Sequence, residues 1–243
     1  MIPRFHCPDL RADIGKIVPL PEAAAHHAAR VLRLKTGDAV TLFDGKGQAW
    51  QAELAQVARE VLALVCGVGP GIAEPALRIT LVQALPGGDK MDWVIQKAVE
   101  LGVTAIQPVA AKRSVVKLNA ERALKRAAHW QEVAVSACEQ CGRNVVPPIL
   151  PLLDLPQYLA LPAADNEQRF LLVPSGGQRV RDMPAPDGSV TLLIGPEGGF
   201  DDGEESLARR AGFAPLLLGP RVLRTETAGL AALAAMMAVW GDI

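Results

Sequence analysis

A glycine turn between an apolar and an acidic segment is the part of this sequence whose residue types best fit a binding site. Residues 192–205 read LLIGPEGGFDDGEE, which predicts a strand, a turn and a helix start. Because glycine has no Cβ, such a turn leaves backbone N–H groups where a ligand can approach closely. Phosphate is the usual ligand, but the glycine spacing matches neither the phosphate-binding loop nor the dinucleotide spacing Gly-x-Gly-x-x-Gly. Four acidic residues at the helix start would also repel an anion: Asp201, Asp202, Glu204 and Glu205. The stretch therefore favours a neutral or cationic ligand.

This turn is one of three Pro- or Gly-rich loops that follow expected strands. From residue 77 onward, apolar strands alternate with helical segments, which predicts a parallel sheet with crossover helices. The expected strands are LRITLVQAL, VTAIQPVA, RFLLVP, VTLLIG and APLLLG, and the expected helices run from about Asp89 to Leu101, from about Ala120 to Cys141, from Asp202, and along the C-terminal segment. Such sheets bind ligands beyond the carboxyl ends of their strands. Three strands end in Pro- or Gly-rich loops, at residues 173–177, 195–199 and 218–220, and these loops form the predicted binding edge.

The N-terminal part of the chain has a different pattern. Its segments AVTLFDG, QAWQAELAQV and VLALVCGV have alternating or β-branched apolar residues between polar breaks, which predicts a small β-barrel or sandwich. A helix is expected before them, from Glu22 to about Leu32. The stretch GPGIAEPAL, residues 69–77, has the glycine and proline density of a linker. We therefore expect two domains, residues 1–72 and 73–243.

Composition limits the class of protein. With 243 residues, half of them hydrophobic, the chain can bury a full core. Its longest apolar stretch, residues 228–240, is too short for a membrane span, which needs about 20 apolar residues. No secretion signal opens the sequence and four cysteines are too few for a disulfide scaffold, so we expect a cytoplasmic protein without a membrane partner.

Charge is spread unevenly along the chain. The net charge of -1 argues against a general nucleic-acid binder, yet six basic residues face one acid between Lys112 and Arg126. This patch is either a solvated helix face with its leading loop or a contact surface.

Several weaker motifs are set aside. CEQC, residues 138–141, has the spacing of half a zinc or redox site, but no second Cys/His pair lies at ligand spacing. GVGPG, from Gly67, reads as a linker, and PGGDK, from Pro86, serves equally as a strand exit and a helix entry. The adjacent His26 and His27 have no Cys or carboxylate at ligand spacing, so no metal site is expected.

The motifs LLIGPEGGF and LLLGPRVLRTETAGLAAL resemble the two signature loops of the SPOUT methyltransferases, specifically the ribosomal small-subunit RNA uridine-N3 methyltransferase E family. The resemblance extends to KMDWVIQKAVELGVTAIQPVAAKRSVVK, EQCGRNVVPPI, IPRFHC and HHAARVLRLKTGD, so it covers both expected domains. It implies an α/β fold class: a C-terminal SPOUT trefoil-knot domain with a parallel sheet, preceded by a small PUA-like β-barrel domain. It also implies methylation of a specific uridine at N3 in 16S ribosomal RNA of the small subunit, with S-adenosylmethionine as the cofactor. Cys141 departs from the pattern, where a small residue such as serine is expected.

The resemblance also assigns residues to the cofactor. S-adenosylmethionine is a cationic sulfonium with an adenine, so bare backbone suits the adenine and nearby acid suits the sulfur. The expected cofactor contacts are Val173, Pro174, Ile194, Gly195, Pro196, Glu197, Gly198, Gly199, Leu217, Leu218, Gly219, Val222, Leu223, Arg224 and Thr227.

Catalysis and RNA binding need further side chains. A cation beside uracil would stabilise the anion formed when N3 loses its proton, with Arg224 the first candidate and Arg113 the second. Glu197 or Glu226 could accept the proton, but Glu226 could equally cap a helix and Arg224 could simply pair with an acid. The expected RNA contacts are Arg4, His27, Arg30, Arg33, Lys112, Arg113 and Lys117.

Two rival functions and one assembly question stay open. An RNA-binding module without catalysis would bind no cofactor, and a dehydrogenase would bind NAD, although the dinucleotide spacing is missing. The expected helix over residues 228–240 is apolar on every side, and such a helix must be buried on all sides. A homodimer through the knotted domain, as in SPOUT enzymes, would cover it; alternatively, other helices of the same chain would.

Overall fold

The computed structural model describes residues 2–243 and divides into two compact units. Unit 1 comprises the residues up to Glu74 together with Val135–Val146, and unit 2 comprises Pro75–Ala134 and Pro147–Ile243. Unit 1 is therefore discontinuous in sequence, which differs from the two continuous segments expected.

Unit 1 is built on a five-stranded sheet in the order β1-β3-β4-β5-β2. Its strands are β1 (Arg4–His6), β2 (Ile17–Pro19), β3 (Ala39–Phe43), β4 (Ala49–Val57) and β5 (Val61–Val68). The three central strands run antiparallel to one another and coincide with the three segments predicted from alternation, whereas β1 pairs parallel to β3. Their inward side chains, such as Leu42, Leu54 and Ala63, are fully buried in the core of the unit.

The helix expected over residues 22–32 has a more irregular form. It consists of α1 (Glu22–His26) and a π-helical turn, η1 (His27–Val31). Arg33 then adopts a left-handed φ of 55°, which ends the helical path. Single π-helical turns often occur at functional sites.

The second segment of unit 1 is held by long-range hydrogen bonds. The Arg4 guanidinium donates to Asn144 Oδ1 at 2.5 Å, the His6 N–H donates to Glu139 Oε1 at 3.0 Å, and Arg143 forms an ion pair with Glu74. Sequence patterns report local structure, so they did not show this return of the chain.

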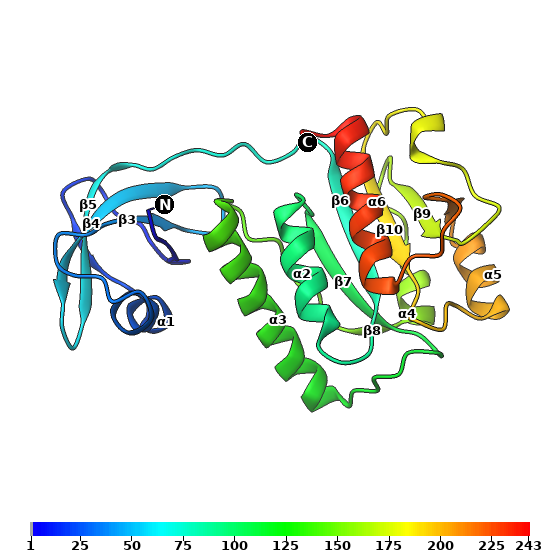
Figure 1. The fold of residues 1–243 in the computed structure, drawn as a ribbon, viewed down its shortest axis with the longest axis horizontal. Helices are drawn as coiled ribbons and strands as arrows, with labels where there is room; N and C mark the ends of the chain where they lie inside the picture. Colours follow the sequence, from blue (N-terminus) through cyan, green and yellow to red (C-terminus); the bar gives the residue numbers. More distant parts are fainter. Residues whose placement is uncertain (1) are drawn as a thin grey trace. The chain divides into compact units, whose positions relative to one another are not determined.

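Unit 2 contains a six-stranded, fully parallel sheet in the order β11-β9-β10-β6-β7-β8 (Figure 1). The strands are β6 (Arg78–Ala84), β7 (Ala105–Ala110), β8 (Leu153–Asp154), β9 (Gln168–Leu172), β10 (Ser189–Ile194) and β11 (Ala214–Leu216). The helices are α2 (Lys90–Glu100), α3 (Ala120–Cys141, whose last turns belong to unit 1), α4 (Leu155–Leu159), the 3-10 turn η2 (Val180–Asp182), α5 (Asp202–Arg210) and α6 (Thr225–Trp240). The predicted α/β class and parallel sheet are confirmed; only the short β8, α4 and η2 were not anticipated.

Helix α6 packs against the centre of the sheet and against α2 (Figure 1). Gly229 permits this close approach, because a Cβ there would lie 3.1 Å from Leu81 Cδ1 and 3.2 Å from Ile194 Cγ1. Leu230, Leu233 and Met236 are buried, so part of the apolar surface of α6 is covered within the chain. Among residues 2–243 no helix is long and apolar enough to cross a membrane.

Candidate ligand-binding site at the ends of the strands

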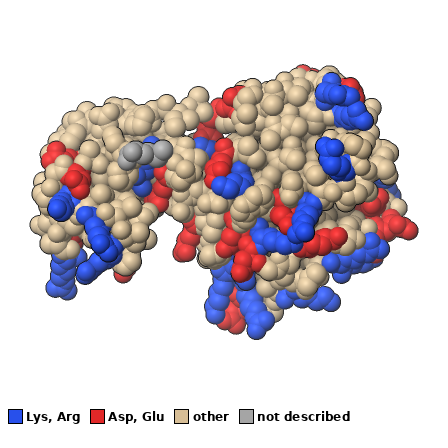
Figure 2. All heavy atoms as spheres, in the orientation of Figure 1, with Lys and Arg blue, Asp and Glu red and all other residues tan. Residues whose placement is uncertain are grey.

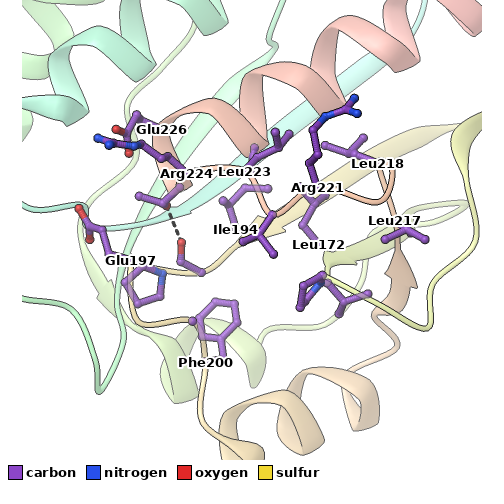
Figure 3. A pocket seen from close by; sticks show the side chains of 18 of the residues that line it. Leu172, Ile194, Glu197, Phe200, Leu217, Leu218, Arg221, Leu223, Arg224 and Glu226 are labelled. Atoms are coloured by element: carbon purple, nitrogen blue, oxygen red, sulfur yellow. Dashed lines mark hydrogen bonds between the residues drawn. The ribbon is translucent and has the colours of Figure 1, made fainter.

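A cavity of about 450 Å³ lies in unit 2, where the loops after β9, β10 and β11 meet the start of α6 (Figure 3). Its volume is in the range of small-molecule sites. All the predicted cofactor contacts line it except Gly198 and Thr227. The lining residues that were not predicted as site residues are Lys90, Leu172, Phe200, Glu205, Arg221, Thr225 and Ala228.

The glycine turn after β10 is held in place from outside the cavity. Gly199 has φ +65°, and its N–H donates to the Pro196 carbonyl at 2.9 Å. The Arg113 guanidinium donates to the carbonyls of Gly198 at 2.9 Å and Phe200 at 3.3 Å. Arg113, the second catalytic candidate, does not line the cavity and braces this loop instead.

Thr225, the first residue of α6, connects the loop to the sheet. Its Oγ1 accepts a hydrogen bond from Gln83 Nε2 at 2.9 Å and donates one to the Gly195 carbonyl at 2.5 Å. Gln83 is fully buried on β6. The chain from Gln83 through Thr225 to Gly195 therefore fixes the strand end, the turn and the helix start relative to one another.

One end of the cavity holds carboxylates, and the other holds apolar side chains together with Arg221. Figure 3 shows Glu197 and Glu226 at one end and Leu172, Leu217 and Leu218 at the other. Glu197 Oε1 accepts hydrogen bonds from the Gly87 N–H at 2.9 Å and from Lys90 Nζ at 3.0 Å.

Glu226 and Lys90 complete the ionic end. Lys90 Nζ also lies 3.4 Å from Glu226 Oε2. Burial raises the pKa of Glu197, but the hydrogen bonds from Gly87 and Lys90 outweigh it and lower the pKa overall. The hydrogen bond to Glu197 raises the pKa of Lys90, so Lys90 stays cationic. Lys90 was missed from sequence because its partners lie more than 100 positions away, although it belongs to the PGGDK turn.

The acidic residues after the turn have separate tasks. Asp201 caps α5 by accepting from the Glu204 N–H, and it pairs with Lys112 Nζ at 2.7 Å. The buried Glu204 accepts from the Lys112 N–H at 2.8 Å. Of the four acids only Glu205 lines the cavity, so it is the one placed to face a cationic ligand. Lys112, a predicted RNA contact, is tied to Asp201.

The other predicted RNA contacts are distributed over both units. His27, Arg30 and Arg33 belong to the η1 turn and its end, where both arginines are exposed. Lys and Arg side chains gather along one edge of unit 1 in Figure 2. Lys117 is exposed in unit 2.

Arg4, predicted as an RNA contact, is buried in unit 1. Only 8% of it is exposed, its guanidinium donates to Asn144 and lies 5.0 Å from the Phe43 ring centre, and burial lowers its pKa. It is a structural residue of unit 1 and is not placed to bind phosphate.

The cysteine pair of CEQC belongs to the end of α3. Cys138 is buried, and burial raises its pKa to about 12. No group of three or more His, Cys, Asp or Glu side chains that could hold a metal ion occurs among residues 2–243.

Comparison with known proteins identifies relatives of both units. An RNA methyltransferase domain model matches residues 73–237, and an RNA methyltransferase PUA domain model matches residues 20–64. A ribosomal RNA small subunit methyltransferase E from Buchnera aphidicola subsp. Schizaphis graminum is 33% identical, covering 95% of this chain and 94% of the relative. The protein of the same name from Synechocystis is 36% identical, covering 93% of this chain and 74% of the relative.

Solved structures agree with the sequence relatives. The crystal structure of a ribosomal RNA small subunit methyltransferase E from Neisseria gonorrhoeae, bound to S-adenosyl methionine, has 42% identity and a TM-score of 0.92 over the whole of both chains. A Legionella pneumophila protein in complex with the bound cofactor SAM has 37% identity and a TM-score of 0.94, also over both whole chains.

Proposed function

Because this chain belongs to the ribosomal RNA small subunit methyltransferase E family, we propose that it transfers a methyl group from S-adenosylmethionine to N3 of one uridine in 16S ribosomal RNA. The observation that carries the proposal is the cavity formed by the two signature loops, with apolar walls at one end and carboxylates at the other. We further propose that its partner is the 16S ribosomal RNA of the small subunit and that the enzyme works in the cytoplasm.

The residues of the cavity fit this cofactor. At Gly199 an added Cβ would meet no atom within 4 Å, so the space beside the turn is open to a ligand. Apolar side chains suit the adenine ring, and Glu205 suits a cationic sulfur. Bound there, the cofactor would supply an electrophilic methyl group.

The chain must then orient the uridine and handle its proton. The base has to be unpaired or flipped out so that N3 is accessible. Arg224 is exposed at the start of α6, and its side chain forms no ion pair in the part of the chain that the structure describes, so it is free to face uracil. It remains our first candidate for stabilising the uracil anion, whereas Arg113 positions the glycine turn.

Calorimetry separates this function from a pure RNA-binding module. We expect S-adenosylmethionine to bind the purified protein with one site per chain. A protein that binds RNA but gives no heat with the cofactor would favour the RNA-binding module.

Charge reversal tests the proposed RNA surface. In the double variant Arg30→Glu and Arg33→Glu, we expect RNA affinity to fall about tenfold or more. The slope of log affinity against log salt concentration should become shallower by the equivalent of roughly two phosphate contacts. Cofactor affinity should be unchanged, because both residues belong to unit 1. Arg59→Glu, an exposed arginine of the same unit, is the matched control. An RNA affinity equal to that of the wild type would place the surface elsewhere.

We also propose a homodimer through α6. Ala231, Ala234 and Ala235 are only half-buried within the chain, and small residues permit close helix contact. Light scattering should give about twice the chain mass of 25.7 kDa. Ala235→Glu should dissociate the dimer and inactivate it, while Ala120→Glu, at the exposed start of α3, should do neither. A fully active protein with the mass of one chain would refute the dimer.

A further inference from the structure

Glu197 and Glu226 share Lys90 at the ionic end of the cavity, but their surroundings differ (Figure 3). We propose that Glu226 is the catalytic residue that accepts the N3 proton, and that Glu197 is a positioning residue that holds the glycine turn. This assignment rests on the proposed methylation of uridine N3.

Glu197 is engaged by the protein itself. Its Oε1 accepts from the Gly87 backbone and from Lys90, which ties the turn after β10 to the segment that leads into α2. Residue 87 lies so close that a Cβ there would be 3.4 Å from Glu197 Oε1. The lowered pKa of Glu197 has the same origin, since hydrogen bonds to a carboxylate favour its charged form. Glu197 is therefore a weak proton acceptor, and its hydrogen bonds hold the glycine turn to Gly87 and Lys90.

Glu226 has the opposite character. Its Oε2 is buried and receives no hydrogen bond within residues 2–243, and its nearest cation, Lys90, is 3.4 Å away. The α6 helix has no side-chain cap at its N-terminus, so the structure does not support the capping role considered for Glu226. Buried carboxylate oxygens normally have donors, and their absence requires a reason. Lys90 supplies the nearest positive charge to Oε2, and Glu226 lines the cavity with 14% of its side chain exposed.

Lys90 lies between the two carboxylates. It forms a hydrogen bond with Glu197 and an ion pair with Glu226, so its single charge offsets part of the repulsion between the two carboxylates. Lys90 thus holds Glu226 at the edge of the cavity, where no backbone N–H group of the described residues is bound to it as Gly87 is bound to Glu197.

The proton step balances with these groups alone. The N3–H bond breaks and the proton passes to the Glu226 carboxylate, making a neutral acid. The electron pair stays on N3 and forms the bond to the methyl carbon as the bond from that carbon to sulfur breaks. Water then takes the proton from Glu226 and restores the carboxylate.

Two variants separate the proposed roles. For Glu226→Gln we expect single-turnover methyl transfer to fall about 100-fold or more, while the calorimetric Kd for the cofactor stays within about threefold of the wild type. For Glu197→Ala we expect the reverse: cofactor Kd rises about tenfold through the lost clamp, and the rate at saturation changes little. Glu226→Asp, which keeps a carboxylate, should retain part of the rate.

A more acidic substrate gives a second, independent readout. In RNA with 5-fluorouridine at the target, N3 loses its proton more easily, so Glu226→Gln should recover about tenfold or more of its lost rate and Glu197→Ala should gain nothing comparable. Full activity of Glu226→Gln, loss of its cofactor binding, or absence of this recovery would each overturn the assignment. If the wild type itself methylates no RNA, the proposed function fails. That failure is distinguishable from a wrong assignment of Glu226, which would show only in the variants.

Discussion

Gly199→Val is expected to abolish measurable S-adenosylmethionine binding, whereas Gly212→Val is expected to leave it unchanged. Both glycines have a positive φ, +65° and +87°, and neither has an atom within 4 Å of the position of a Cβ. A β-branched residue in this region costs roughly 1–3 kcal/mol of strain in either place. Only Gly199 lines the cavity, so only there do the strained loop and the added side chain reach the ligand.

The Gly212 variant shows whether backbone strain alone accounts for the loss. Circular dichroism and thermal unfolding should report similar, modest destabilisation for both variants. We expect the cofactor Kd to rise more than about 100-fold for Gly199→Val, which corresponds to more than about 2.7 kcal/mol. Equal cofactor affinity in the two variants would remove the glycine turn from the binding site.

Thr225→Val is expected to weaken cofactor binding by about 10- to 100-fold, and Thr225→Ser by less than about threefold. Valine has the shape of threonine but no hydroxyl. The Gly195 carbonyl would lose its donor and Gln83 Nε2 would lose one of its two acceptors. Leaving such groups unpaired costs about 1–3 kcal/mol each. Serine keeps the hydroxyl, so normal binding by Thr225→Val would show that the hydroxyl chain does not shape the site.

The site could be predicted from sequence as far as its elements are local. Strand, turn and helix signals placed residues 195–199 and 218–220 at the carboxyl edge of a parallel sheet, and both segments contribute to the cavity. The same local signals did not reveal Lys90 or Gln83, because each acts through a partner more than 100 positions away.

Local sequence patterns also could not predict which charged residues are buried or whether the chain is knotted. Arg4 reads as a surface cation in sequence, but the return of residues 143 and 144 to unit 1 buries it. The trefoil knot follows from family likeness alone, because neither composition nor periodicity reports how a chain passes through itself. The π-helical turn within residues 22–32 has no distinguishing hydrophobic period either.

Methyl transfer to small ribosomal subunits that lack this modification tests the central claim most directly. The purified protein would be incubated with isotope-labelled S-adenosylmethionine and the subunits, and the RNA would then be digested and mapped by mass spectrometry, with the Gly199→Val variant as the inactive control. We predict label at a single uridine of 16S ribosomal RNA, carried on N3. Label on another atom or nucleotide, or no label from a protein that binds the cofactor, would contradict the account.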